Sequence, residues 1–92
     1  DLERVNLKGA DMAGVKLRSA NLKNADLKKV DLRRSDLEHA DFSKANLSSA
    51  NFTGAKMSES LFIDADLTET KMDSADITDT QFQGAIGFKV SP

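Results

Sequence analysis

The chain has 92 residues, 39% of them hydrophobic and 30% charged, and a formal net charge of −2. This length suits one small domain, and the composition is too polar for a membrane span and too apolar for a disordered segment. Because cysteine is absent and histidine occurs only once, disulfide frameworks, thiolate metal sites and cysteine nucleophiles are excluded.

The chain begins at Asp1 without an initiator methionine, an apolar signal segment or an amphipathic leader. We therefore expect a processed protein or a fragment of a longer one. The compartment stays open between the cytoplasm, the periplasm and the thylakoid lumen, because a removed segment would have carried the targeting information.

A pattern with a period of five residues runs from Leu2 to Phe82. All 17 residues at this spacing are large and apolar, and all 17 residues at the same spacing from Val5 to Ala85 are small or β-branched. Asp or Asn directly precedes the large residue in 12 of the 17 repeats. Each repeat thus consists of a small residue, a leading residue, a large residue and two variable residues.

A period of five fits neither a helix nor a continuous strand. On an α-helix it would carry the large residues around the whole circumference, and on a strand it would send them to alternate faces. A chain that runs nearly straight, turns and repeats directs both the small and the large residue into one narrow interior. The sequence therefore predicts a solenoid with a square cross-section.

This pattern resembles the pentapeptide-repeat family, whose motif is a small residue, Asp or Asn, Leu or Phe, and two variable polar residues. Four runs match it at every position: Ala20-Asn21-Leu22-Lys23-Asn24, Ala25-Asp26-Leu27-Lys28-Lys29, Ala40-Asp41-Phe42-Ser43-Lys44 and Ala45-Asn46-Leu47-Ser48-Ser49. The resemblance covers residues 1 to about 85. It implies an all-β fold, a right-handed quadrilateral parallel β-helix with four repeats per coil and slightly more than four coils.

A coil of four repeats would stack residues that are twenty positions apart. One resulting core ladder is Leu2, Leu22, Phe42, Phe62 and Phe82, in which three aromatic rings can stack between coils. The leading Asp and Asn side chains are short enough to accept hydrogen bonds from backbone amides of the neighbouring turn. We therefore expect more than half of the acidic residues to serve the architecture.

No motif for catalysis, phosphate binding or metal binding occurs in the chain. His39 stands at an outward variable position, and the inward hydroxyl residues lack a neighbouring base, so we expect the latter to bond to the local backbone. Those residues are Ser35, Ser60, Thr70 and Thr80. The sequence predicts a protein that is not an enzyme and needs no cofactor or metal.

Charge is distributed unevenly along the chain. Residues 1–44 carry ten basic and eight acidic residues, whereas residues 45–92 carry three and seven. The second coil displays a basic ridge of Lys23, Lys28, Lys29, Arg33 and Arg34, and the fourth displays Asp64, Glu69, Asp73 and Asp79. The ridge is either a solvated face or a contact for a partner protein, and the lack of interleaved aromatic residues disfavours nucleic acid.

Two local departures from the pattern suggest further contacts. Leu61 stands where Asp or Asn belongs and Ile63 stands at an outward position, so both are candidates for covering by a partner or by the tail, or are harmless exposed residues. The frame ends after Ala85, which divides the chain into a solenoid of residues 1–85 and a tail of residues 86–92. We expect Ile86, Phe88 and Val90 to cap the last coil, the alternative being a frayed terminus.

The resemblance implies a non-catalytic interaction scaffold. Two classes of function stay open: a rigid module that binds another protein, and a structural spacer or block that associates with itself. Some members of the family are acidic, elongated DNA mimics that bind topoisomerases. That role fits this chain less well, because the chain is short and its outward charge is mixed.

Overall fold

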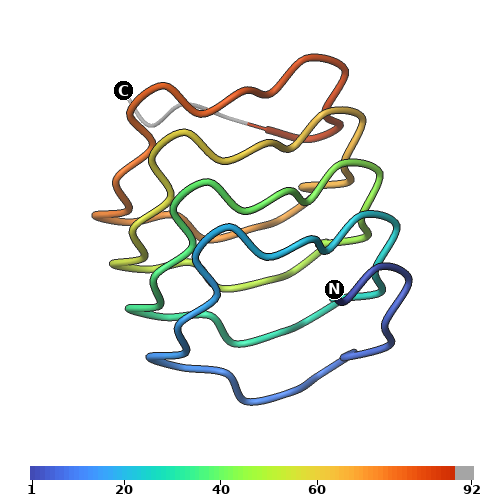
Figure 1. Ribbon diagram of the computed structural model, residues 1–92, viewed down its shortest axis with the longest axis horizontal. Helices are drawn as coiled ribbons and strands as arrows, with labels where there is room; N and C mark the ends of the chain where they lie inside the picture. The colour runs from blue at the N-terminus through green and yellow to red at the C-terminus, as the bar shows by residue number, and fades with distance from the viewer. Residues whose placement is uncertain (89–92) are drawn as a thin grey trace.

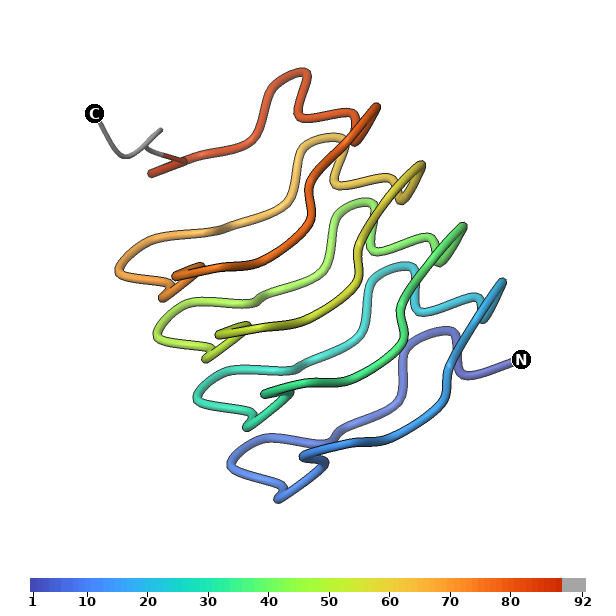
Figure 2. The same cartoon turned by 90° about the vertical axis from the view of Figure 1, so that its left-hand side faces the viewer.

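The computed structural model describes residues 1–88, which wind into a stack of four-sided coils (Figures 1 and 2). No helix occurs in this part of the chain, and its strands are reduced to single-residue parallel bridges. Each bridge joins a leading residue to the leading residue twenty positions later, from Asn6 and Asp26 to Asp66 and Ile86. The predicted coil length is therefore confirmed, with coil one at 1–20, coil two at 21–40, coil three at 41–60 and coil four at 61–80.

Each side of the square carries one repeat from every coil. We number the sides by their large residues: side one holds Leu2, Leu22, Phe42, Phe62 and Phe82; side two holds Leu7, Leu27, Leu47 and Leu67; side three holds Met12, Leu32, Phe52 and Met72; side four holds Leu17, Leu37, Met57 and Ile77.

The two variable residues of each repeat form the corners of the square. The N–H of each small residue donates to the carbonyl of the large residue three positions earlier, as Ala50 does to Leu47 at 3.0 Å. The second variable residue has a positive φ, between 55° and 62° at thirteen non-glycine positions. This combination is a β-turn of type II, which redirects the chain by one corner in every repeat.

Backbone hydrogen bonds tie each coil to the coils on both sides. The N–H groups of Leu27 and Lys29 donate to the backbone carbonyls of Asn46 and Ser48 in the next coil at 2.8 and 2.9 Å. The N–H of Asp26 donates to the Val5 carbonyl in the previous coil at 2.9 Å. The same arrangement recurs around the square. Interior coils therefore satisfy their backbone groups without forming long strands.

The leading Asp and Asn residues stabilise the corners, as the sequence predicts. In all 12 repeats that carry one, its Oδ1 accepts the N–H of the first turn residue, two positions later, at 2.9–3.3 Å. These bonds occupy a turn amide that points away from the coil-to-coil ladder. The acidic column is thus part of the architecture.

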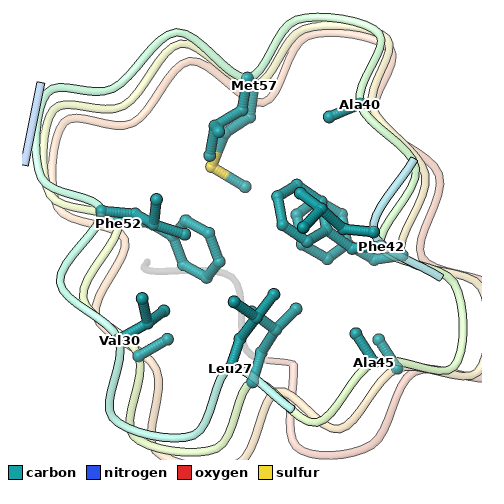
Figure 3. Packing of buried hydrophobic residues seen from close by; sticks show 14 of the residues in the cluster. Leu27, Val30, Ala40, Phe42, Ala45, Phe52 and Met57 are labelled. Atoms are coloured by element: carbon teal, nitrogen blue, oxygen red, sulfur yellow. The ribbon is translucent and has the colours of Figure 1, made fainter. Parts of the chain in front are cut away.

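The interior is filled by large side chains that meet from all four sides. Figure 3 shows Leu27, Phe42, Phe52 and Met57 converging, with Val30, Ala40 and Ala45 in the remaining space. Phe62 stacks on Phe42 with ring centroids 4.9 Å apart and on Phe82 at 5.5 Å, while Phe52 meets Phe42 and Phe62 edge-on. The buried hydroxyls of Ser35 and Ser60 donate to Leu32 and Met57 at 2.6 Å. The four sides therefore share one buried apolar core.

Candidate interaction surface

The basic ridge of coil two does not form one patch, because its residues lie on three different sides. Lys23 belongs to side one, Lys28 and Lys29 to side two, and Arg33 and Arg34 to side three. Two of these cations already have partners: Lys23 Nζ lies 3.7 Å from Asp41 Oδ2, and Arg33 holds Asp31 through two hydrogen bonds of 2.8 and 2.9 Å.

Arg33 offsets a local concentration of negative charge. Asp11 and Asp31 pair directly in neighbouring coils, and they are the one place among residues 1–88 where two leading aspartates do so. The Arg33 side chain, followed by its backbone N–H, lowers the pKa of the Asp31 carboxyl, while Asp31 and the more distant Asp11 raise the pKa of Arg33. Arg33 therefore has a structural role within the coil stack.

Lys28, Lys29 and Arg34 have no carboxylate within 4 Å among the described residues. Lys8 lies beside Lys28 in the neighbouring coil, where the Gly9 N–H donates to the Lys28 carbonyl at 2.8 Å. We call Lys8, Lys28, Lys29 and Arg34 the open basic surface. Lys8 is absent from the ridge expected from coil two alone, although its distance of twenty residues from Lys28 places it in the same column.

Glycines flank the open basic surface. A Cβ on Gly9 or Gly14 would meet nothing within 4 Å, and a Cβ on Gly54 would lie 3.3 Å from Arg34 Cγ. Lys29 and Arg34 thus project from corners that have open space in coil one, and Arg34 extends over Gly54 in coil three.

The acidic residues of coil four are exposed and spread around the square. Glu69 and Asp73 line a hollow of about 550 Å³ together with Thr68, Thr70, Lys71, Met72 and Gly87. Asp64 lies on side one, where its carboxylate occupies the space next to the Gly84 Cα, and Asp79 lies at the corner after side four. The hollow contains neither a histidine nor a buried acid.

Leu61 and Ile63 lie on side one as outward residues, and both are half-buried. Their backbones belong to the coil ladder: the Phe42 N–H donates to the Leu61 carbonyl at 2.7 Å and the Lys44 N–H to the Ile63 carbonyl at 2.8 Å. Each of the two side chains is therefore partly covered within the coil stack, and a contact of the remaining exposed part with a partner stays a prediction.

The segment after Ala85 differs in part from the expected cap. Phe88 stacks on Phe82 with ring centroids 3.8 Å apart, and Gly87 passes so close to Thr68 that a Cβ would lie 2.7 Å from the Thr68 Cα. Ile86 is 62% exposed and does not cover the core, because it continues the outward leading column by pairing with Asp66. Val90 lies outside the described residues.

The family model for pentapeptide repeats matches residues 1–34, 25–62 and 50–86, with eight copies. The chain belongs to the pentapeptide repeat family. The family fold, a right-handed quadrilateral parallel β-helix, is the fold predicted from the sequence and described above.

Three solved pentapeptide repeat proteins are similar to this chain to different degrees. Rfr23 from the cyanobacterium Cyanothece 51142 has a TM-score of 0.86 and 25% identity over 90% of this chain, which spans 57% of that protein's length. Alr5209 from Nostoc PCC 7120 has 26% identity, with 95% and 75% of the two chains covered and a TM-score of 0.45. HetL from Nostoc sp. strain PCC 7120, which is involved in heterocyst differentiation regulation, has 26% identity, coverage of 97% and 59%, and a TM-score of 0.34. No curated protein sequence matches the chain.

Pentapeptide repeat proteins are generally non-enzymatic. Over residues 1–88 of this pentapeptide repeat protein, no group of three or more His, Cys, Asp or Glu side chains is arranged to hold a metal ion. The same part of the chain holds no helix with the length and apolar character needed to cross a membrane. The groups available for recognition are the outward residues of the coils.

Proposed function

We propose that this pentapeptide repeat protein is a non-catalytic, rigid scaffold that binds an acidic partner protein through the open basic surface. The observation that carries the proposal is the presence of three neighbouring cations, Lys28, Lys29 and Arg34, without a carboxylate within 4 Å among the described residues. The solenoid holds their backbones in place through turns and coil-to-coil bonds. A preordered surface of this kind loses little entropy on binding.

A protein partner is favoured over nucleic acid for two reasons. Phe42, Phe52 and Phe62 are buried, and Phe82 and Phe88 pack on the core, so no aromatic ring lies beside the cations to stack on a base. Glu69 and Asp73 lie two coils away on the same part of the molecule, roughly 10 Å along the axis, and would repel a long polyanion. A short acidic segment avoids this repulsion.

A fluorescent poly-glutamate peptide tests the proposal by anisotropy. We expect binding at low ionic strength, weakened by salt, with a loss of roughly threefold to tenfold in affinity for the double variant Lys28→Ala, Arg34→Ala. Lys44→Ala is the matched control, since Lys44 is an exposed cation of side one. Equal affinity for the double variant and the control, or tighter binding of duplex DNA than of the peptide, would contradict the proposal.

The second class of function, self-association, is favoured by a specific observation on side three. There three charged residues of coil two are opposite in sign to the residues at the equivalent positions of coil four.

A further inference from the structure

Side three and the corner that leads into it carry a charge pattern that is antisymmetric about coil three. In coil two the outward residues include Lys29, Asp31 and Arg33, and in coil four the residues of the same columns are Glu69, Lys71 and Asp73. Each of these three charges of coil two is thus opposed in sign by the residue forty positions later, whereas Arg34 corresponds to the uncharged Ser74. The coil-three residues between them, Ser49, Asn51, Thr53 and Gly54, are uncharged. We call these three sets together the side-three surface.

We infer that a second copy of this chain binds the side-three surface in an antiparallel arrangement with two-fold symmetry. A two-fold axis that crosses coil three at right angles to the solenoid axis brings coil two of one copy against coil four of the other. Residues of the same column then face each other, which pairs Lys29 with Glu69, Asp31 with Lys71 and Arg33 with Asp73. Symmetry makes each pair twice, as in any isologous interface.

The two remaining cations of coil two face neutral residues under this rotation. Lys28 meets Thr68 and Arg34 meets Ser74, so no like charges of coils two and four face each other on this surface. On the axis itself, Ser49, Thr53 and Gly54 each meet their own counterpart. Small uncharged residues at the centre let the two backbones approach without burying an unpaired charge.

The other three sides do not have this property. On side four the same rotation sets Asp36 against Asp76 and Lys56 against itself, and on side two it sets Asp26 against Asp66. On side one it sets Lys23 against Ile63. Like charges directly opposite each other disfavour association, so the complementarity is confined to the side-three surface.

The paired residues are accessible to a second copy, because Lys29, Arg33, Glu69, Lys71 and Asp73 are all exposed. The pairs are solvent-accessible, so salt should weaken the dimer.

The inference rests on the proposed function in one respect, since Lys29 belongs to the open basic surface; it names the acidic partner as coil four of a second copy. Sedimentation equilibrium of the wild-type chain should show a reversible dimer at about 20 mM salt that dissociates at about 0.5 M. Lys29→Glu and Glu69→Lys each create two like-charge contacts in a homodimer. Either variant alone should therefore be monomeric at concentrations where the wild type dimerises.

A mixture of the two variants gives the decisive measurement. In a heterodimer of Lys29→Glu with Glu69→Lys, every facing pair is again opposite in charge, so the equimolar mixture should dimerise although neither component does. Lys44→Glu is the control: it makes the same charge change at a residue with the same φ of 61° on side one, and it should dimerise like the wild type. Glu59 and Glu69 already occupy corners with φ of 59° and 57°, so glutamate is compatible with the fold there.

Three results would overturn the inference: a wild type that is monomeric at low salt, a Lys29→Glu variant that dimerises like the control, or a variant mixture that stays monomeric. The peptide assay is run at dilute concentrations where the chain is monomeric. Peptide binding without self-association would refute the dimer and leave the proposed function standing. Self-association without peptide binding would refute the proposed function and leave the dimer standing.

Discussion

At the scale of single residues, the corners of the solenoid require the left-handed backbone region in every repeat. Thirteen non-glycine residues accept this conformation, although it disfavours L-residues with a Cβ. The conformation persists because the turn bond, the Asp or Asn bond and the coil-to-coil bonds all act on the same few residues. Glycine at a corner is thus an advantage of about 1–2 kcal/mol, or more where a neighbour also occupies the Cβ position.

Gly14 and Gly87 separate the cost of the left-handed backbone conformation from the cost of a steric clash at the Cβ position. Both have a φ of 74°, but a Cβ on Gly14 would meet open space, whereas one on Gly87 would lie 2.7 Å from the Thr68 Cα. We expect Gly14→Ala to destabilise the chain by about 1–2 kcal/mol and Gly87→Ala to cost clearly more, because the Thr68 backbone must also move. Urea unfolding of the two variants measures the difference. Equal costs would show that Gly87 does not approach Thr68 as described.

The leading aspartates make stability depend on pH. The Thr68 and Thr78 hydroxyls, and then their backbone N–H groups, lower the pKa values of Asp66 and Asp76. A carboxyl whose folded pKa lies below its unfolded value near 3.9 contributes stability above about pH 4 and loses it as the pH falls through the folded pKa. The melting temperature should therefore decrease when the pH is lowered below about 4.

The double variant Asp66→Asn, Asp76→Asn isolates this effect. Asn51 already accepts both the Thr53 hydroxyl at 2.6 Å and the Thr53 N–H at 3.0 Å, so asparagine can replace aspartate at a leading position. We expect a smaller loss of melting temperature between pH 7 and pH 3 in the variant than in the wild type. An unchanged pH dependence would mean that these two carboxyls do not titrate differently in the folded and unfolded chain.

At the scale of the repeat, the large residue decides stability because it is the part of the repeat that reaches the shared interior. Phe62 is fully buried and stacks between Phe42 and Phe82. Phe62→Ala should lower the free energy of unfolding by about 3–5 kcal/mol, since the narrow interior cannot collapse onto the cavity. Ser48→Ala, at a half-buried turn position, is the control and should change it by less than about 0.5 kcal/mol. Similar values for the two variants would refute the inward assignment of the ladder.

At the scale of the whole molecule, each coil contacts only its neighbours, so the middle of the stack is better protected than its two ends. The large residues from Leu22 to Leu67 are buried, whereas those of coil one and those after Leu67 are half-buried. In such a one-dimensional stack the end coils open first. Hydrogen exchange should be slowest for amides such as Leu37 and Ala50 and faster for Leu7 and Ala75. Uniform protection would indicate that the chain opens as one unit.

The sequence by itself determined the coil, its interior and its corners. A period of five with a second period of twenty leaves one geometry that buries every large residue, and the bond from a leading Asp or Asn to an amide two positions later is local to its repeat. Both features depend on spacing along the chain alone. Residues that are twenty positions apart lie above one another, so the charged residues that share a column on side three also follow from the sequence once the coil length is known.

Only the tertiary structure decided which charged residues are open to a partner. Lys23 and Arg33 appear equivalent to Lys28 and Arg34 in the sequence, yet they reach carboxylates through side-chain conformations that spacing does not specify. Likewise, Ile86 continues the outward column, Gly87 passes so close to Thr68 that a Cβ would lie 2.7 Å from the Thr68 Cα, and Phe88 stacks on Phe82. Contacts between coils and rotamer choice set these outcomes, whereas the local pattern sets the fold.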